Sequence, residues 1–407
     1  MKKKLFILVG AGASVDFGIP SVWDINNKLV ERAKVEFPIE HDDGDLYSFF
    51  MKKINNFYNS KEATYEEILY NIEILASIYC PKNSWSPSSY NRFAQLIDKT
   101  IDIPQIQIKD KSICTLGCSE VDSDTLYAFC SCCIDNIVSY IINQCQLVDK
   151  NNIKILYNFI KTIKDNFDPY IFSLNHDDLF IQADQHLFTG FNDNNFAYKE
   201  IMNRKNGNFI YYLHGSIHFK IPDKESNLIW DEKLIMNNQS TSFARKRIKH
   251  KEGYETPISP IIAGYAKTNQ ITRQPFRTFF VKANESINDA DAVLFIGYGF
   301  SDYHINSIFS DIDSKIPIVI IDFAQKGKRM PFKKRTDEWS TNLRNTLQLK
   351  NIPDISDDEF QKDYILEKID INRNISIWYE GFLEACLHPE YIISTLFKSV
   401  PPSTPAT

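Results

Sequence analysis

The sequence lacks three features that would place it quickly in a broad class. Its charge is nearly balanced, with 46 Lys and Arg against 52 Asp and Glu, so it carries no overall signature of nucleic-acid binding. No apolar run approaches the ~20 residues of a transmembrane span. The apolar run at residues 5–9 is shorter than the ~7–15 residues of a secretory signal. We therefore expect a soluble, cytoplasmic protein without membrane contact or direct sequence-specific nucleic-acid binding.

Two local basic runs stand out against this balance, at residues 245–251 and 326–335. Charge runs of this kind are usually solvated surface, and we predict solvated surface for both. The alternative is a contact with a polyanion or a protein partner.

The composition indicates a folded chain with a large core. Hydrophobic residues make up 43% and aromatic residues 13% of the 407 positions. This length fits two to three domains, or one α/β domain with large insertions. Cys130, Cys132 and Cys133 lie in an apolar helical stretch and are expected to be buried free thiols. A zinc site would use Cys114 and Cys118 with two later cysteines, and we expect no metal.

A buried strand is predicted to run into a glycine-rich turn near the start of the sequence. The apolar strand is followed by Gly10-Ala11-Gly12-Ala13-Ser14 and then by Gly18-Ile19-Pro20. Such glycines let phosphate oxygens approach backbone N–H groups at a helix N-terminus, so the turn predicts a phosphate-binding loop. The turn matches neither the dinucleotide-binding fingerprint nor the phosphate loop of ATPases. Val15 replaces the third small residue of the dinucleotide fingerprint, and the lysine of ATPase phosphate loops is absent.

The remaining pattern predicts an α/β fold: a Rossmann-like parallel sheet with helices on both faces, a large helical insertion and a C-terminal extension. Strands are expected at 4–9, 170–173, 209–213, 292–296, 317–321 and 375–379. Helices are expected at 22–33, 46–58, 65–79, 90–99, 125–145, 153–166, 276–287, 305–311 and 380–387. The predicted organisation is a split nucleotide-binding core at 1–40 and 166–325, a helical insertion at 41–165, a C-terminal α/β extension at 326–398 and a disordered tail at 399–407.

Three polar clusters follow predicted strands. They are Asn175-His176-Asp177-Asp178, His214-Gly215-Ser216 and residues 297–306. Ligands of open parallel sheets bind beyond the carboxyl ends of the strands, so we expect these clusters to converge with the Gly10 turn. Each also has a structural interpretation: Asn175 and Asp177 as helix N-caps, His214 as a turn histidine, and Gly297 as a tight strand exit.

Taken in order, these motifs resemble the sirtuin family. Its signature is a GAGxS loop followed by GIP, an asparagine-x-aspartate motif, a catalytic histidine followed by glycine, and a later glycine-serine turn. The sequence supplies these as Gly10 to Ser14 with Gly18 to Pro20, Asn175 to Asp177, His214-Gly215, and Gly297 to Ser301. The resemblance implies a Rossmann-like fold that binds NAD.

The departures from the sirtuin deacylases are informative. Those enzymes follow GIP with a phenylalanine-arginine pair, where this sequence has Val22-Trp23. They also carry four zinc cysteines after the histidine, where this sequence has only Cys386. What remains is similar to the bacterial sirtuin-like effector branch, which destroys NAD during phage infection. With no evident sensor module, the chain looks most like the separate subunit of a sirtuin-like and HerA system.

This resemblance implies an NAD glycohydrolase of antiviral defence that acts by abortive infection. NAD would be its substrate, and it would form a homo-oligomer with a possible HerA-type ATPase partner and no zinc. By motif match, Asn175 would hold the ribose or the attacking water. Asp177 would orient Asn175 or the nicotinamide amide, and His214 would act as general base.

The resemblance also assigns the residues that would contact the rest of NAD. They are Gly10, Ala11, Gly12 and Ser14 at the pyrophosphate, Gly297, Ser301 and Asp322 on the adenosine side, and Pro20 and Asp302 nearby. Asp322 is included because an acidic strand end suits ribose hydroxyls. Two alternatives remain: a non-catalytic NAD or ADP-ribose sensor or assembly subunit, and an NAD-dependent protein deacylase.

Overall fold

The computed structural model divides the chain into two compact units. Unit 1 comprises Met1–Ile19, Cys145–Leu213 and Pro275–Thr407, and unit 2 comprises Pro20–Gln144 and His214–Gln274. The structure describes residues 2–40, 43–58, 62–78, 123–221, 228–234, 246–249, 255–263, 270–310, 312–325, 328–356, 360, 366–370 and 372–397. Each unit is therefore assembled from stretches that are far apart in the sequence.

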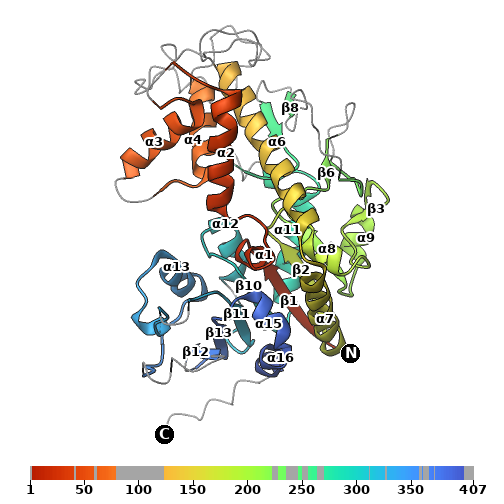
Figure 1. Cartoon of the computed structure of the whole chain (residues 1–407). Helices are drawn as coiled ribbons and strands as arrows, with labels where there is room; N and C mark the ends of the chain where they lie inside the picture. The colour runs from red at the N-terminus through yellow and green to blue at the C-terminus, as the bar shows by residue number, and fades with distance from the viewer. Residues whose placement is uncertain are drawn as a thin grey trace. The chain divides into compact units, whose positions relative to one another are not determined.

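Unit 1 is built on a seven-stranded sheet in the order β12-β13-β11-β10-β1-β2-β5 (Figure 1). Every neighbouring pair is parallel except β12 with β13. The strands are β1 (Lys3–Val9), β2 (Phe167–Ser173), β5 (Phe209–Tyr212), β10 (Ala292–Ile296), β11 (Ile318–Ile321), β12 (Leu366–Asp370) and β13 (Ile375–Trp378). Because β10, β11 and β13 are buried along their whole length, they read as short continuous apolar runs rather than alternating patterns.

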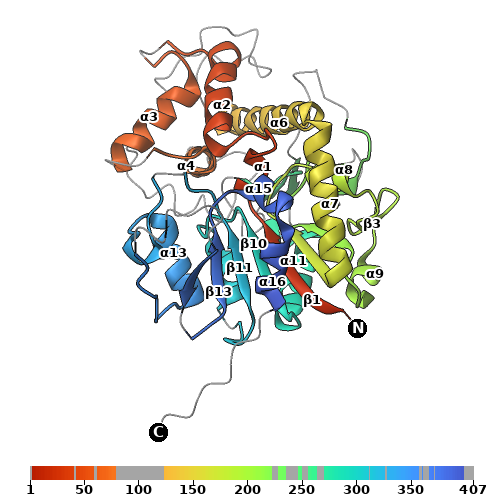
Figure 2. The ribbon, with the colours of Figure 1, turned by 60° about the horizontal axis from the view of Figure 1, so that its bottom comes forward.

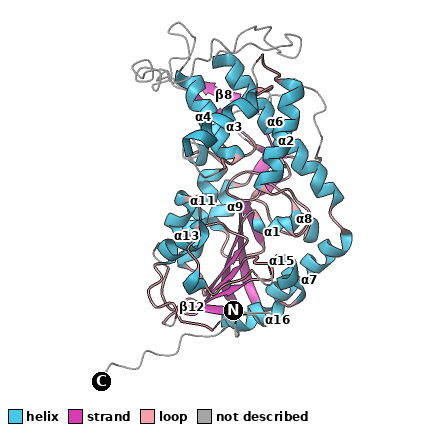
Figure 3. Ribbon diagram, turned by 60° about the vertical axis from the view of Figure 1, so that its left-hand side comes forward, coloured by secondary structure: helices cyan, strands magenta, loops and turns pink. Residues whose placement is uncertain are grey.

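Helices cover both faces of this sheet, as Figures 2 and 3 show. On one face lie α7 (Lys150–Asn166), α15 (Phe382–Leu387) and α16 (Pro389–Phe397), and on the other lie α11 (Phe276–Asn288) and α13 (Glu338–Leu347). The buried stripe of α7 has helical spacing: Leu156, Phe159, Ile160 and Ile163. The predicted doubly covered α/β sheet is thus confirmed.

Short elements follow the strands of unit 1. They are α1 (Gly12–Val15), α8 (Leu179–Ala183), the β3 (Phe191–Asn192) and β4 (Asn195–Phe196) hairpin, α9 (Tyr198–Asn203), α12 (Tyr303–Asn306) and the 3-10 turns η2 (Ser307–Phe309) and η3 (Phe332–Lys334). The predicted helix at 305–311 thus starts earlier than expected, and it tightens into η2.

The turn after β1 is tied to the C-terminal part of the chain. Asp16 Oδ2 accepts hydrogen bonds from the backbone N–H groups of Phe382, at 2.7 Å, and Leu383, at 3.2 Å. These are the first residues of α15, which follows Gly381 at φ +84°. The Asp16 carboxylate therefore caps α15 and fixes the glycine-rich turn against it.

Unit 2 contains the helical segments that the sequence predicted. They are α2 (Val22–Glu36), α3 (Leu46–Tyr58), α4 (Tyr65–Ile78) and most of α6 (Ser123–Leu147), with two hairpins, β6 (Phe219–Lys220) with β7 (Ile229–Trp230) and β8 (Lys246–Lys249) with β9 (Glu255–Ile258). A capping box formed by Ser21 and Asp24 starts α2. The helix expected at 90–99 and the tail at 399–407 lie outside the described residues. Of the basic run at 245–251, the structure describes Lys246–Lys249 as strand β8.

The α6 helix carries the cysteine cluster. Its segment Thr125–Leu147 is long and apolar enough to cross a membrane, a stretch that we did not expect, although half of its most apolar window is buried. Cys130 and Cys133 are 0% and 3% exposed, as predicted, while Cys132 is half-buried. These two form a CxxC pair, yet burial raises the pKa of both thiols well above the usual value. They are therefore held in the protonated form that binds metals poorly.

The C-terminal strands extend the main sheet. β13 pairs in parallel with β11, and the antiparallel β12 closes the edge, with a register shift between Lys368 and Asp370. The stretch at 326–398, expected to form a C-terminal α/β extension, thus supplies two strands of the main sheet.

Candidate functional site

The turn after β1 packs directly against the turn after β10. Gly10 N–H donates to the Ile296 carbonyl at 2.8 Å, and Gly12 N–H donates to the Gly297 carbonyl at 2.9 Å. A Cβ on Gly297, which has φ +58°, would lie 2.0 Å from the Ala13 nitrogen. A Cβ on Gly10 would lie 2.7 Å from the Gly297 oxygen. Contact between two backbones therefore requires glycine here whether or not a ligand is bound.

This packing uses most of the N–H groups of the glycine-rich turn. Those of Gly10, Gly12, Ala13 and Ser14 all donate to carbonyls within the protein. Ala11 and Gly12 are the exposed residues between the buried Gly10 and Ala13. A phosphate would therefore meet the turn at Ala11 and Gly12.

Two polar side chains that follow β2 meet the same turn. Asn175 Nδ2 donates to the Gly10 carbonyl at 2.9 Å and to Ser14 Oγ at 2.7 Å. Ser14 Oγ in turn donates to Asp177 Oδ2 at 2.6 Å. Ser14, Asn175 and Asp177 are 3%, 7% and 7% exposed, so we call them the buried network. The predicted convergence of the Asn175 cluster with the turn is observed within unit 1.

The amide of Asn175 has a fixed orientation and one unused group. The Gly10 carbonyl can only accept, so Nδ2 must face it. The opposite atom, Oδ1, is buried and has no hydrogen-bond partner. Buried polar atoms in native proteins are nearly always paired, so this oxygen is placed to accept from a bound ligand or water.

Asp177 is a buried carboxyl whose pKa is raised to about 6, chiefly because burial disfavours its charge. The bonds from Ser14 and from Leu179 N–H oppose this shift, and the neighbouring charge of Asp178 adds to it. The bond from Leu179 shows that Asp177 also supports the start of α8. Asn175 does not cap this helix, because its amide is committed to the turn.

His214 lies two residues after the end of β5. The second segment of unit 1 ends at Leu213, so His214 belongs to unit 2, as does Pro20. Its side chain is buried, and its carbonyl accepts from Ile262 N–H at 2.7 Å. Gly215 has φ +95°, and a Cβ there would lie 2.2 Å from the Pro260 oxygen. The His-Gly motif thus has a backbone reason for its glycine.

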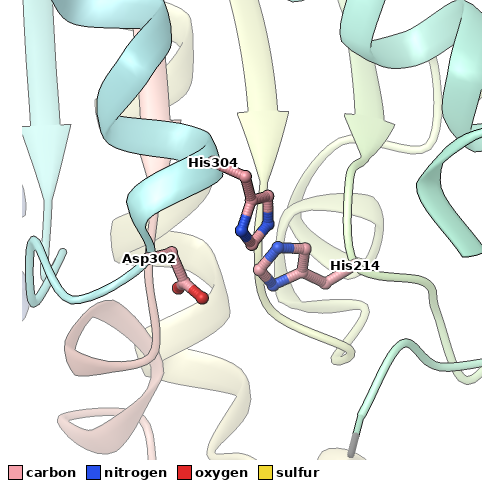
Figure 4. A group of neighbouring side chains, drawn as sticks. All are labelled: His214, Asp302 and His304. Carbon is pink, nitrogen blue, oxygen red and sulfur yellow. The ribbon is translucent and has the colours of Figure 1, made fainter. Parts of the chain in front are cut away.

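The loop after β10 is held by side chains that we did not assign from the sequence. Tyr298 Oη donates to Asn306 Oδ1 at 2.7 Å, and Asn306 Nδ2 donates to the Phe300 carbonyl at 2.8 Å, where φ is +53°. Ser301 is exposed. Figure 4 shows Asp302 at the start of α12 and His304 within it, and it also labels His214. The spacing of Tyr298 and Asn306 gave no signal in the sequence.

Asp322 lies at the end of β11, one strand beyond this loop. Gly297 N–H donates to the carbonyl of the preceding Ile321 at 2.8 Å. The Asp322 carboxylate lies 3.6 Å from Arg335 Nη1. Burial raises the pKa of Asp322, and the charge of Arg335 opposes this shift. Asp322 is therefore a charge-compensated group, unlike Asp177.

Two arginines of the basic run at 326–335 contradict the predicted solvated surface. Arg335 pairs with Asp322 and Asp337, and Arg329 pairs with Glu380. Their side chains are 17% and 3% exposed. Both are structural cations of unit 1, because nearby strand ends and loops supply carboxylates that neutralise them.

A family model described as a SIR2-like domain matches residues 169–320. This match covers 152 of the 407 residues. The match runs from β2 to β11, so it includes Asn175, Asp177 and His214, while the Gly10 turn lies outside it. The matched range is therefore similar to a SIR2-like domain over the middle strands of the main sheet.

Solved structures give a more distant likeness to this chain. One is a Sir2 homologue in complex with NAD, 12% identical, covering 79% of this chain and 78% of that chain, with a TM-score of 0.30. Another is a mutant Sir2 homologue in complex with 2′-O-acetyl ADP ribose, 12% identical, covering 86% and 95%, with a TM-score of 0.32. Among curated proteins the comparison found no relative.

Proposed function

We propose that this protein is an NAD glycohydrolase, which cleaves NAD and water into nicotinamide, ADP-ribose and a proton. The observation that carries the proposal is the buried, unpartnered Oδ1 of Asn175, which is fixed beside the glycine-rich turn and lies in the range that matches a SIR2-like domain. An acceptor held in one orientation suits a ribose hydroxyl or the attacking water.

The chemistry requires groups placed around the ribose. Breaking the bond between nicotinamide and ribose leaves positive charge on the ribose carbon, and water must then lose a proton as it adds. Asn175 Oδ1 would accept from the ribose hydroxyl or from that water. Asp177, through Ser14, holds the amide in place. His214 would take the proton, directly or through a ribose hydroxyl.

The rest of NAD would follow the carboxyl edge of the sheet. The exposed Ala11 and Gly12 would receive the pyrophosphate, with Gly10 and Ser14 shaping the turn. Gly297, Ser301, Asp302 and Asp322 would border the adenosine half, and Pro20 would lie near the site. On the sequence resemblance, the reaction would deplete NAD during phage infection, in a homo-oligomer working with a HerA-type ATPase.

The test is nicotinamide release from NAD by the purified chain, with and without a HerA-type ATPase and DNA. We expect release without any acylated peptide, and its loss in Asn175→Ala and His214→Ala. Asn288→Ala is the matched control, because Asn288 is an exposed α11 asparagine whose Nδ2 donates to the Asn284 carbonyl one turn earlier. Strict dependence on an acylated lysine would establish a deacylase. Binding of NAD without release under every condition would establish a sensor.

A further inference from the structure

A cavity lies at the amino edge of the main sheet, away from the candidate functional site. Residues that follow α12, that end α13 and that turn from β12 into β13 line it, and all of them belong to unit 1. Ile318 at the start of β11 pairs with Ile375 at the start of β13, which marks this edge. β11 has four residues of ~3.3 Å each, so its two ends are about 13 Å apart. The cavity therefore lies at the other end of the strand from Asp322.

The cavity is lined by an arginine with an unused donor. Arg373 Nη1 donates to the carbonyl of Leu347, the last residue of α13, at 2.6 Å. Arg373 Nε is buried and has no hydrogen-bond partner among the described residues. Nε and Nη2 form the fork with which a guanidinium binds two oxygens of a carboxylate or a phosphate. Because buried donors are nearly always paired, this fork indicates a partner from outside the described chain.

Arg335 of the same unit shows such a fork when the protein itself fills it. Its Nε donates to Asp337 Oδ2 at 2.8 Å, and its Nη2 donates to Asp337 Oδ1 at 3.2 Å. Its Nη1 faces Asp322 at 3.6 Å, and its guanidinium stacks 4.3 Å from the ring centroid of Trp339. We call these four residues the Arg335 cluster. The Arg373 guanidinium has no carboxylate in the place that Asp337 takes here.

The charges around the cavity favour an anion. Lys350 and Arg373 are the cations of its lining, and Asp370 is its one carboxylate. Asp370 Oδ1 already accepts from the backbone N–H groups of Asn372, at 2.9 Å, and Arg373, at 3.1 Å. Burial lowers the pKa of Arg373, and the charges of Asp370 and of the exposed Asp313 oppose this shift, although neither forms an ion pair with it. An anion at the fork would offset the cost of burying this cation.

We propose that this cavity is a second ligand site, which binds a small organic oxyanion through the fork of Arg373 and the ammonium group of Lys350. The ligand carries a carboxylate or a phosphate, the groups whose paired oxygens match a guanidinium fork. The cavity has a volume of about 330 Å³, at the lower end of the roughly 300–1,000 Å³ of small-molecule sites. A single water takes only ~30 Å³. The Leu347 carbonyl uses Nη1 alone, so the ligand binds without displacing it.

The experiment measures binding of glycerol 3-phosphate and of succinate to the full chain by calorimetry, with hydrogen exchange as the local readout. At least one probe should bind and should slow amide exchange in residues 346–351 and 372–374. Arg373→Lys keeps the charge and a donor for Leu347 but has no fork, so it should weaken binding about tenfold or more. Lys350→Gln should weaken binding about two- to fivefold, the scale of an exposed charge.

Lys154→Gln is the control for net charge, because Lys154 is an exposed cation of α7 on the other face of the sheet. This variant should bind as wild type does. Binding of glycerol 3-phosphate alone would identify a phosphate ligand, and binding of succinate alone a carboxylate. No binding of either probe at millimolar concentration would overturn the proposal. Binding that neither Arg373→Lys nor Lys350→Gln weakens would also overturn it. Neither result bears on the proposed NAD reaction.

Discussion

Two carboxylates, Asp177 and Asp322, lie at the carboxyl edge of the same sheet in opposite electrostatic surroundings. Asp177, after β2, is buried with hydroxyl and backbone donors, and no cation is among the groups that shift its pKa. Asp322, after β11, is paired with Arg335. Burying a charge without a counter-ion is costly, so the arrangement around Asp177 is not explained by stability alone. The Asp177 carboxyl group fixes Ser14 and, through it, Asn175, whereas the charge of Asp322 is balanced by Arg335.

The two regions differ in what they leave available to a ligand. The buried network keeps one unused acceptor, Asn175 Oδ1, and one carboxyl that exchanges its proton near pH 6. The Arg335 cluster uses every edge of its guanidinium. The Gly10 and Gly297 turns join the two regions, so changes at the turns should affect both.

The largest effect is expected from Gly297→Ala. Its Cβ would lie 2.0 Å from the Ala13 nitrogen and 2.4 Å from the Gly12 carbonyl carbon, and backbone atoms cannot move aside as a side chain can. We expect the free energy of unfolding to fall by about 4 kcal/mol or more. Gly299→Ala is the matched control, since the nearest atom would be Ser301 Oγ at 3.7 Å. Urea denaturation measures the free energy of unfolding of the two variants. Equal values would contradict backbone packing as the reason for glycine at position 297.

The next effect concerns the compensated carboxylate. Arg335→Met removes the cation and leaves Asp322 and Asp337 facing each other across a partly buried site. We expect a loss of about 3 kcal/mol in the free energy of unfolding at pH 7, the lower end of the range for breaking a buried pair. The loss should shrink at pH 4, where protonation of Asp322 relieves the repulsion. A loss that does not depend on pH would show that Arg335 acts by packing on Trp339.

For Asp177, which has no cation beside it, wild type rather than the variant should gain stability at low pH. The pKa of Asp177 is about 6 in the folded protein and about 3.9 in an unfolded chain, so the folded state binds the proton more tightly. Lowering the pH from 6 to 4 should therefore stabilise wild type relative to Asp177→Asn. The gain is at most about 1.4 kcal/mol for each pH unit. Parallel stability curves for the two proteins would show that Asp177 titrates normally.

A smaller effect should follow loss of the Asp16 cap. Asp16→Ala removes the acceptor for two N–H groups at the start of α15, which should cost about 1 kcal/mol of stability. Asp16→Asn keeps an acceptor and should retain most of it. Thermal melts of the pair give the comparison, and identical melting temperatures would contradict the capping role.

The sequence predicted the sheet best where the strands are buried on both faces. The predicted strand at 292–296 coincides with β10, and the helix at 46–58 coincides with α3, because apolar runs and amphipathic spacing are local signals. β12 was missed. Three of its five residues, Glu367, Lys368 and Asp370, are charged and interrupt the apolar run, while Glu367 finds its partners Phe332 and Tyr379 only in the folded chain.

The residues of the candidate site that have a local sequence signal were predicted, and those that depend on distant partners were not. Asn175 and Asp177 were found by their place after a strand, and the structure brings them to Ser14. Arg335 was misread as solvated because its partners are distant in sequence, and spacing carries no sign of an ion pair. The glycines of the turn were attributed to a ligand, while the structure shows that backbone contact already requires Gly10 and Gly297.

The most direct measurement of the central claim is nicotinamide release from NAD by wild type and by Asn175→Ala, with both shown to be folded by their melting curves. We predict that wild type, mixed with a HerA-type ATPase and DNA, produces nicotinamide and ADP-ribose without an acylated peptide. The variant should lose about 100-fold or more of this rate, the scale of removing one transition-state hydrogen bond. Full consumption of NAD by folded Asn175→Ala would contradict the claim.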